Sequence, residues 1–284
     1  MKTYLESLQH ILDNGETRTD RTGVGTLSVF GIQQRYDLSK SFPAVTTKKL
    51  AFKACLSELL WFIEGSTDER RLAEILHGTR DSEKKTIWTA NSKDFGSNDL
   101  GPVYGKQWRQ WETNRSVTFK DETVPLVIDQ LQELIESIKT NPTSRRHILT
   151  AWNPGEIDQM ALPPCHCFAQ FYVSSDNKLS CQIYQRSCDM FLGVPFNIAS
   201  YSLLTHMIAQ VCDLEVGDLV HVLGDAHIYL NHLEQVKEQL QREPLPAPTL
   251  WINPDINNID DFAMDDFKLE NYNPMESIKA PMAV

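Results

Sequence analysis

The sequence predicts one mixed α/β domain of the α+β kind, in which helices flank a mixed β-sheet. Two observations predict this class. Apolar residues recur at helical spacing in several segments, and apolar or alternating runs of strand length lie between those segments. No internal repeat or linker-like stretch interrupts the 284 residues. We therefore assign residues 1–284 to a single domain, long enough to bury a substantial core.

The first predicted elements are a helix and a strand joined by a turn. One face of the helix holds the apolar residues Tyr4, Leu5, Leu8, Ile11 and Leu12. Gly15 would end this helix. The stretch Asp20–Gly25, with its two glycines, predicts a turn. It leads into Leu27–Tyr36, whose alternating pattern predicts a strand.

Two helices are predicted next, and they differ in character. Ala51–Glu64 is mainly apolar, contains Glu58, and would end at Gly65. The chain then turns polar and charged from Ser66 to Lys85, and we expect a short helix at about Glu69–His77. This whole stretch is predicted to lie at the surface.

The second half of the chain mixes helices and strands. An amphipathic helix is marked by Val127, Ile128, Leu131, Leu134, Ile135 and Ile138. Asn141-Pro142 would close it. Four segments have strand length: His147–Trp152, Cys167–Val173, Leu179–Arg186 and Leu219–Leu223. Two further helices are predicted, a long apolar one at Ile198–Val211 and a polar one at about Tyr229–Gln241.

Composition and charge argue against several classes of protein. The formal net charge of −11 disfavours general nucleic-acid binding, so an anionic ligand would need a local group of arginines. No apolar run approaches the roughly 18 residues of a membrane helix, and the first residues lack a signal sequence. We therefore expect a cytoplasmic protein.

The cysteines follow no disulfide or zinc pattern. They are Cys55, Cys165, Cys167, Cys181, Cys188 and Cys212. Free thiols in a reducing compartment are the simpler interpretation. Cys165-His166-Cys167 holds ligand types that metals use, but adjacent strand residues point to opposite faces and no second cluster has zinc-finger spacing. We expect no metal.

Cys165 is the first candidate for chemistry. It follows Pro163-Pro164 on a rigid loop before a strand, where a nucleophile would stand at the edge of a pocket. A thiol with a pKa of about 8.5 needs a nearby cation to ionise. Arg186, at the end of a neighbouring predicted strand, would supply it. A buried structural cysteine is the alternative interpretation.

Three other features have both a functional and a plain interpretation. Arg145-Arg146 matches paired phosphate oxygens, or forms a solvated charge pair. Glu58, if desolvated, would have a raised pKa and serve as a general acid–base, or it forms a salt bridge. His227 and Tyr229 share one face if their strand extends, and would then donate to a sugar hydroxyl. Alternatively they belong to an ordinary strand–helix turn.

In their joint order these segments resemble the folate-dependent thymidylate synthases, from about Tyr4 to Val284. The matching stretches are Asp20–Gly23, Phe42–Lys49, Glu58–Phe62, Asp99–Arg109, Pro163–His166, Tyr184–Asp189 and Phe191–Tyr201. The resemblance implies reductive methylation of dUMP to dTMP, with 5,10-methylenetetrahydrofolate as one-carbon and hydride donor. It also implies the fold of that family and a homodimer in which the sheets of two subunits pack back to back.

The resemblance assigns catalytic roles that the chemistry supports. Cys165 would add as a thiolate to carbon 6 of uracil, with Arg186 favouring its charged form. Glu58 would act as acid–base through ordered water. Three further residues match catalytic positions: Trp88 beside the folate, Tyr104 at the proton of carbon 5, and His166 in the water network.

Binding roles are also implied. The dUMP contacts would be Arg21, Arg186 and Ser187 at the phosphate, Asn197 at the uracil edge, and His227 and Tyr229 at the deoxyribose hydroxyl. Arg145 and Arg146 would reach the phosphate in the partner subunit. Asp189 is assigned to both the dUMP site and the pterin. The folate pocket would be lined by Lys48, Ile87, Trp88, Leu192, Gly193, Phe196 and Ala283, and the C-terminal segment would close over it.

Some positions depart from the family pattern. Thr89 stands where an aspartate is common, which puts a supporting hydrogen bond in doubt. Leu223 and Ala226 replace the usual glycine and threonine beside His227. The stretch 66–85 is longer than in the most compact bacterial members.

Three rival functions remain in view. A uracil hydroxymethylase of the same fold would deliver water instead of hydride. A cytosine-specific one would carry aspartate at Asn197. An RNA-binding protein on this scaffold is disfavoured by the acidic charge. A cysteine hydrolase needs a histidine near the thiol in space, and His166 would point away.

Overall fold

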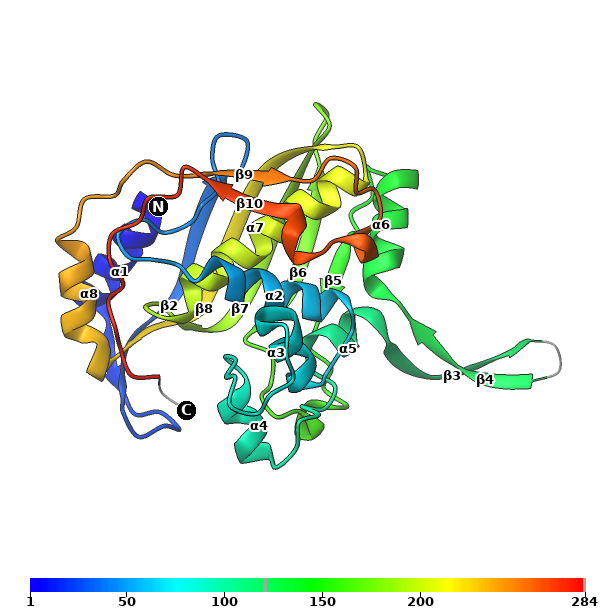
Figure 1. Ribbon diagram of the computed structural model, residues 1–284, viewed down its shortest axis with the longest axis horizontal. Coiled ribbons are helices and arrows are strands. Elements are labelled where there is room, and N and C mark those ends of the chain that lie inside the picture. The colour runs from blue at the N-terminus through cyan, green and yellow to red at the C-terminus, as the bar shows by residue number, and fades with distance from the viewer. Residues whose placement is uncertain (120–121, 283–284) are drawn as a thin grey trace.

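The computed structural model describes residues 1–119 and 122–282, and a six-stranded mixed β-sheet forms its centre (Figure 1). In spatial order the strands are β1 (Glu16–Arg18), β2 (Thr26–Asp37), β8 (Glu215–Tyr229), β7 (Lys178–Asp189), β6 (His166–Val173) and β5 (Ile148–Thr150). Neighbours pair antiparallel except β7 and β8, which run parallel. A parallel pair needs a crossover, and a helix supplies it here.

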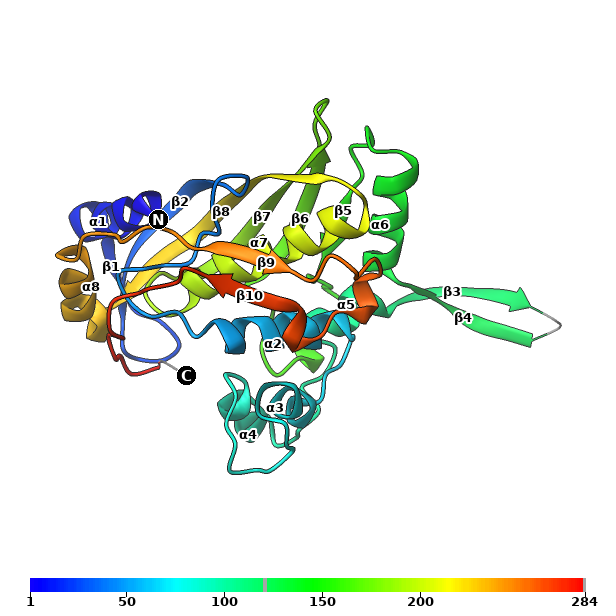
Figure 2. The same cartoon turned by 45° about the horizontal axis from the view of Figure 1, so that its top comes forward.

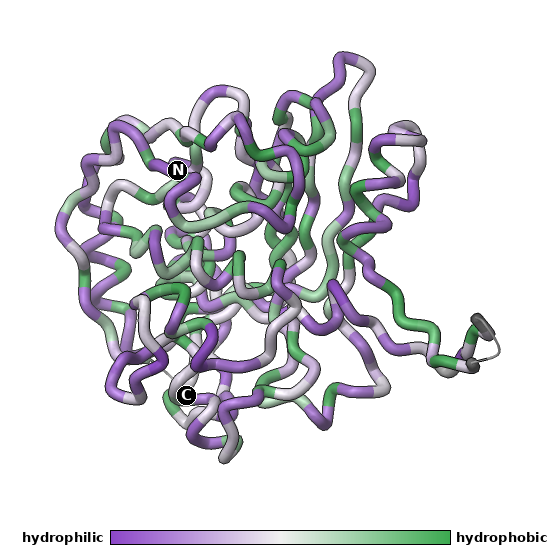
Figure 3. The backbone as a smooth tube through the Cα atoms, turned by 45° about the vertical axis from the view of Figure 1, so that its right-hand side comes forward, coloured by the Kyte–Doolittle hydropathy of each residue, from purple (hydrophilic) through white to green (hydrophobic). Residues whose placement is uncertain are grey.

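That crossover helix, α7 (Gly193–Val211), packs on β7 and β8 and is buried along most of its length. Helix α2 (Phe52–Ile63) packs on α7, and α1 (Lys2–Asn14) covers β2 and β8 (Figure 2). The remaining helices are α3 (Glu69–His77), α4 (Thr89–Phe95), α5 (Tyr104–Arg109), α6 (Gln130–Thr140) and α8 (Leu233–Leu240). Figure 3 shows hydrophobic segments concentrated among the central strands and helices, with hydrophilic ones around them.

The other face of the sheet is open. Along β6 and β7 exposure alternates: Tyr172 and Tyr184 are 64% and 40% exposed, whereas Phe171 and Ile183 are buried. A broad hollow on this face includes Arg35, Gln182 and Val220. One side of the sheet therefore leaves aromatic and aliphatic side chains without cover within one chain.

Two further strand pairs lie outside the central sheet. Strands β3 (Trp111–Phe119) and β4 (Glu122–Ile128) form an antiparallel hairpin that extends away from the rest of the molecule (Figure 1). Strands β9 (Thr249–Ile252) and β10 (Phe267–Glu270) pair near the C-terminal end. Short 3₁₀ turns cover Ile157–Gln159, Leu230–His232, Ile259–Asp261 and Met264–Asp266.

The predicted fold class is confirmed, and so are most elements. The short helix at Glu69–His77 has the predicted bounds because Asp68 caps its first turn and Gly78, at φ 73°, ends it. The predicted helix from Val127 was wrong at its start. Val127 and Ile128 belong to β4, and Asp129 caps α6 by accepting the Gln132 N–H at 3.0 Å.

Two other expectations need correction. The last polar helix begins at Leu233, not Tyr229, because β8 runs on to Tyr229 and a 3₁₀ turn follows. The stretch 66–85 is not wholly a surface segment, since Glu69 and Arg70 are 1% and 8% exposed. Within the described residues, no helix is both long and apolar enough to cross a membrane.

Candidate active site

Cys165 lies where the 163–165 loop enters β6, and its free thiol is half-buried. Two contacts fix its backbone. The Cys165 N–H donates to the Tyr104 hydroxyl at 2.7 Å, and the Cys165 carbonyl accepts from the Arg186 N–H at 2.8 Å. The thiol therefore stands at the start of β6 on a backbone that hydrogen bonds hold in place, just before a strand as the sequence predicts.

Arg186 is the cation beside this thiol. Its guanidinium donates to the Pro164 and Pro163 carbonyls at 2.9 and 3.0 Å and lies 5.4 Å from the centre of the Trp152 ring. Burial raises the pKa of Cys165, and Arg186 acts against this rise without cancelling it. The unliganded chain thus holds Cys165 mainly as a thiol, and Arg186 alone does not ionise it.

Tyr104 and His166 form an aromatic stack behind the thiol. Their ring centres are 4.2 Å apart, and the His166 Nδ1 lies 2.8 Å from the Tyr201 hydroxyl. Burial lowers the pKa of His166 to about 3, so its ring is neutral at physiological pH. His166 bonds Tyr201 rather than the cysteine, which agrees with the expectation that it points away from the thiol.

Glu58 is a half-buried carboxyl on α2 with a single close polar partner among the described residues. The Trp88 indole Nε1–H donates to Glu58 Oε1 at 2.7 Å. Burial raises the pKa of Glu58 to about 7, although the Trp88 hydrogen bond lowers it in part. A carboxyl with a pKa near neutrality exchanges protons readily, which favours the acid–base interpretation over a salt bridge.

Asn197 on α7 is held in one orientation by a chain of hydrogen bonds through two buried side chains. The Gln185 Nε2–H donates to Asn197 Oδ1 at 3.0 Å, and Gln185 Oε1 lies 2.8 Å from His221 Nε2. Burial lowers the pKa of His221 to about 3, so the neutral ring donates through Nε2. Because Asn197 Oδ1 accepts from Gln185, its NH₂ group is left to donate elsewhere.

His227 and Tyr229 share one face of β8, as predicted for an extended strand. Their ring centres lie 5.2 Å apart, edge to face. His227 Nδ1 is 3.3 Å from Asp225 Oδ1, and Asp225 also accepts from Ser28 Oγ at 2.6 Å. On the same strand, Leu223 and Ala226 are fully buried in the core.

The electrostatics of Tyr229 link several candidate residues. Burial raises its pKa to about 12, the charges of Asp189, Asp20 and Cys165 add to the rise, and Arg21 lowers it. Arg21 is exposed on the 20–25 turn. That turn is fixed by the Asp20 carboxylate, which accepts from the Thr22 and Gly25 N–H groups at 3.0 and 2.8 Å.

Asp189 and the start of α7 form another group of candidate residues. Asp189 Oδ1 accepts from the Phe191 and Leu192 N–H groups at 3.0 and 3.1 Å, and its other oxygen has no partner within residues 1–119 and 122–282. A Cβ on Gly193 would lie 3.6 Å from Asp189 Cβ and 3.7 Å from Asn197 Oδ1, so Gly193 lies between them. Phe196 and Leu192 are half-buried nearby.

Lys48 has an unusual environment for a lysine. Its ammonium donates to the Phe191 carbonyl and lies 3.5 Å from the centre of the Phe191 ring. Burial lowers the pKa of Lys48 to about 7, while Asp189 acts in the opposite direction. The side chain is therefore buried beside Asp189 rather than spread along an open surface.

Four candidate positions are not gathered around Cys165 in this way. Arg145 and Arg146 are exposed before β5, and the Arg145 carbonyl accepts from Gln170 Nε2 at 3.4 Å. Gln170 is five residues along β6 from Cys165, roughly 17 Å at the usual strand rise. Ile87 is 56% exposed beside Trp88. Ala283 lies outside the described residues.

Sequence reasoning gave no role to three residues that the structure places in contact with the candidates. Gln185 orients Asn197, Asp225 contacts His227, and Tyr201 contacts His166. Gln185 had a detectable signal, because it occupies an inward position of β7 in line with Ile183. A polar residue at an apolar position of a strand must find a partner.

A half-buried thiol beside a guanidinium, with a carboxyl of raised pKa nearby, is typical of an enzyme that uses a cysteine nucleophile. A comparison with known protein families matches residues 2–284 to thymidylate synthase. The match covers essentially the whole chain. The chain belongs to the thymidylate synthase family and is a methyltransferase; enzymes of this family methylate dUMP with methylenetetrahydrofolate as co-substrate.

Proposed function

We propose that this chain converts dUMP to dTMP and leaves dihydrofolate, acting as a homodimer with one catalytic domain per subunit. One observation carries the proposal: at the start of β6, the Tyr104 hydroxyl and the Arg186 guanidinium both contact the backbone of the loop that holds the Cys165 thiol. Six free cysteines suit a reducing compartment, so we place the enzyme in the cytoplasm.

Cys165 performs the covalent step. Its thiolate forms a bond to carbon 6 of uracil, and the ring electrons move to carbon 5 and oxygen 4 as an enolate. Glu58, near half-protonation at neutral pH, donates a proton toward oxygen 4 through water. The approach of the substrate phosphate to Arg186 and Arg21 fixes the nucleotide so that carbon 6 faces the sulfur.

The folate supplies the methylene carbon and then a hydride, and the residues that would hold it fit such a molecule. Ile87, which precedes Trp88 in the chain, is 56% exposed and offers apolar surface to a flat heterocycle. The free oxygen of Asp189 would accept a hydrogen bond from the pterin. Carbon 5 would bond to the methylene carbon, and once the carbon 5 proton leaves toward Tyr104 the bond from that carbon to the folate nitrogen would break. Hydride from the folate would then complete the methyl group, and the electron pair of the Cys165–carbon 6 bond would leave with the sulfur as thiolate.

Asn197 reads the uracil edge in this proposal. With Oδ1 turned to Gln185, its NH₂ group donates to oxygen 4, which cytosine lacks. His227 and Tyr229 donate to the deoxyribose hydroxyl, and Ser187 joins the arginines at the phosphate. Uracil rather than cytosine is therefore the base.

Two observations support the dimer. The open sheet face leaves Tyr172 and Tyr184 exposed, which suits burial against a second copy. Arg145 and Arg146 lie before β5, and Arg145 contacts Gln170, five residues along β6 from the thiol of their own chain, so they would serve the partner's phosphate. A back-to-back pair of sheets would satisfy both.

The product distinguishes a thymidylate synthase from a hydroxymethylase of the same fold. Incubation with dUMP and methylenetetrahydrofolate should give dTMP, identified by mass, together with an equal amount of dihydrofolate, followed by absorbance. Hydroxymethyl-dUMP without dihydrofolate would contradict the proposal. Incubation with dCMP serves as the control and should give no product.

Asn197→Asp should shift the preference from dUMP toward dCMP. An ionised carboxylate only accepts hydrogen bonds, so it suits the 4-amino group of cytosine and repels oxygen 4 of uracil. We expect the ratio of kcat/KM for dUMP over dCMP to fall by about tenfold or more. Asn14→Asp, at the exposed end of α1, is the control. An unchanged ratio in Asn197→Asp would mean that another residue reads the base.

Mixing two inactive variants tests the shared site. Cys165→Ser lacks the nucleophile, and Arg145→Ala/Arg146→Ala lacks the arginine pair. In a mixed dimer, one site combines an intact Cys165 with intact arginines from the other subunit. After unfolding and refolding together, the mixture should recover roughly a quarter of wild-type activity. No recovery would mean that the arginines act within their own subunit.

A further inference from the structure

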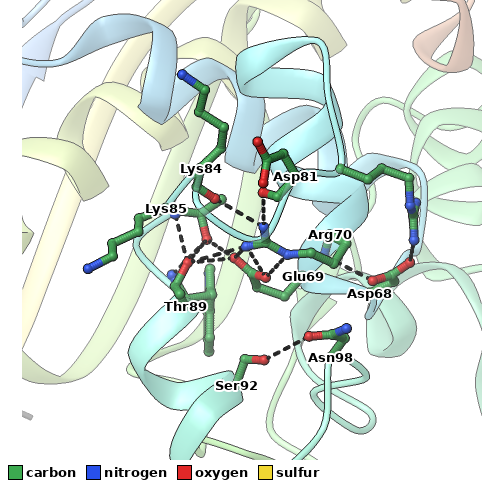
Figure 4. Close-up of polar contacts among 12 residues, drawn as sticks. Asp68, Glu69, Arg70, Asp81, Lys84, Lys85, Thr89, Ser92 and Asn98 are labelled. Atoms are coloured by element: carbon green, nitrogen blue, oxygen red, sulfur yellow. Dashed lines mark hydrogen bonds and ion pairs between the residues drawn. The ribbon is translucent and has the colours of Figure 1, made fainter.

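The segment between α2 and α5 contains a buried ion pair that the proposed chemistry does not use. Glu69 and Arg70 are adjacent at the start of α3, and their charged groups contact each other at 2.5–2.6 Å. The Arg70 guanidinium also donates to the Asp81 and Lys84 carbonyls at 2.6 and 3.1 Å. Figure 4 shows these groups converging with Thr89. A pair this deep is costly unless all its groups are satisfied, so its retention needs a reason.

Both oxygens of the Glu69 carboxylate accept hydrogen bonds, and one of them accepts from residues outside α3. Glu69 Oε1 accepts from the hydroxyls of Thr86 and Thr89 at 2.6 and 2.7 Å. Burial alone would raise the pKa of Glu69, but the hydroxyl of Thr86, the Arg70 guanidinium and the hydroxyl of Thr89 together lower it below its ordinary value. The group is therefore an ionised acceptor at neutral pH.

The two hydroxyls also fix the backbone on either side of Trp88. Thr86 Oγ1 accepts from the Trp88 N–H at 3.1 Å, and Thr89 Oγ1 accepts from the Thr86 N–H at 2.8 Å. Each hydroxyl thus joins the local turn to the Glu69 carboxylate. Thr89 makes this contact without the aspartate that the family pattern favours at its position.

Trp88 connects this turn to the carboxyl of Glu58. Its indole N–H donates to Glu58 Oε1 at 2.7 Å, and the side chain is 5% exposed. Its ring centre lies 6.1 Å from each of the Trp61 and Tyr104 rings. A shift of the 86–89 turn would therefore move the only described donor to Glu58.

We infer that Glu69, neutralised by Arg70, is a positioning residue of the active site: through the hydroxyls of Thr86 and Thr89 it holds Trp88 where the indole orients the Glu58 carboxyl. This inference rests on the proposed role of Glu58. It gives the 66–98 segment a part in the reaction, because that segment supplies the anchor for Trp88. Glu69 acts through other residues and touches no reacting atom.

The inference is tested by removing one hydroxyl while leaving the ion pair intact. Thr86→Val keeps the shape of threonine but cannot donate to Glu69, whereas Thr86→Ser keeps the hydroxyl. Thr140→Val is a matched control, because the Thr140 hydroxyl donates to the Glu136 carbonyl at the exposed end of α6 and makes no described contact with Glu69 or Arg70. All three are compared with wild type as full-length protein without ligands and in turnover.

Two readouts separate positioning from folding. The first is the Trp88 indole N–H resonance of ¹⁵N-labelled protein, assigned by its loss in Trp88→Phe. The second is the division of the effect between kcat and KM for dUMP. In Thr86→Val the resonance should move and kcat should fall about tenfold, with KM within about twofold. Thr86→Ser and Thr140→Val should resemble wild type in both.

The results distinguish this inference from the proposed function. An unmoved indole resonance and an unchanged kcat in folded Thr86→Val would overturn the inference, as would equal losses in Thr86→Ser. Absence of dihydrofolate production by wild type would instead overturn the proposed function, and the indole resonance would still test the positioning. Glu69→Gln should give the same resonance shift as Thr86→Val. If Glu69→Gln does not fold, the comparison of Thr86→Val with Thr86→Ser decides the test.

Discussion

Replacing Cys165 with serine should abolish methylation, with turnover of dUMP falling by about 10⁴-fold or more. A serine hydroxyl is far less acidic than a thiol, and Arg186 does not overcome the effect of burial even for the thiol. No nucleophile would then add to carbon 6. Binding of dUMP should persist, because the phosphate and base contacts come from other residues.

The control for Cys165→Ser is the same substitution at a second thiol of similar exposure. Cys212, half-buried at the end of α7, meets this need, and Cys212→Ser should retain turnover. Rates are measured from dihydrofolate absorbance and dUMP affinity by calorimetry. Residual turnover in Cys165→Ser close to that of Cys212→Ser would mean that residue 165 is not the nucleophile.

Glu58→Gln should lower kcat/KM by roughly 10²–10⁴-fold, the usual contribution of a positioned acid–base group. Glutamine keeps the size and still accepts from the Trp88 indole, so the change removes mainly the proton. The Glu58 pKa of about 7 gives this prediction a pH signature.

The direction of the expected pH dependence follows from two groups that must be in opposite protonation states. Addition needs Cys165 ionised and Glu58 protonated, and the thiol pKa lies above its ordinary value. Below about pH 7 only the thiolate fraction changes, so log kcat/KM rises with pH. Above about pH 7 the loss of protonated Glu58 offsets the gain of thiolate, and the profile becomes flat.

Glu58→Gln should remove that plateau. With no carboxyl to titrate, log kcat/KM should continue to rise through pH 7 toward the pKa of the thiol. The measurement is a kcat/KM profile for dUMP from pH 5.5 to about 9 in both proteins, with stability checked at each pH. A variant profile that bends near pH 7 as the wild type does would assign that titration to another group.

Local sequence signals predicted the elements whose ends are marked by capping or helix-ending residues or by a clear alternation. Asp68 and Gly78 bracket α3, and alternation along β2 and β7 was clear. The helix expected from Val127 started too early because a short apolar run fits both periods, and only the pairing of β4 with β3 decides between them. The β3–β4 hairpin was missed because β3 contains polar residues and no apolar alternation.

The candidate site was partly predictable for a different reason. Cys165, Glu58 and Asn197 belong to distinctive stretches that could be assigned by resemblance. The buried Glu69–Arg70 pair could not, because adjacent residues on a helix do not normally face each other, and a run of charges reads as a solvated surface. Its burial depends on Thr86, Thr89 and the Asp81 backbone folding over it, which no local pattern reveals.

The most direct test of the central claim is to trap the bond between Cys165 and the pyrimidine. In 5-fluoro-dUMP, the fluorine at carbon 5 cannot leave as the proton does, so the complex of protein, nucleotide and methylenetetrahydrofolate should stop before release. After denaturation and digestion, mass spectrometry should find the peptide that contains Cys165 heavier by the sum of nucleotide and folate. An unmodified Cys165 peptide, or the same adduct on another cysteine, would contradict covalent catalysis at this site.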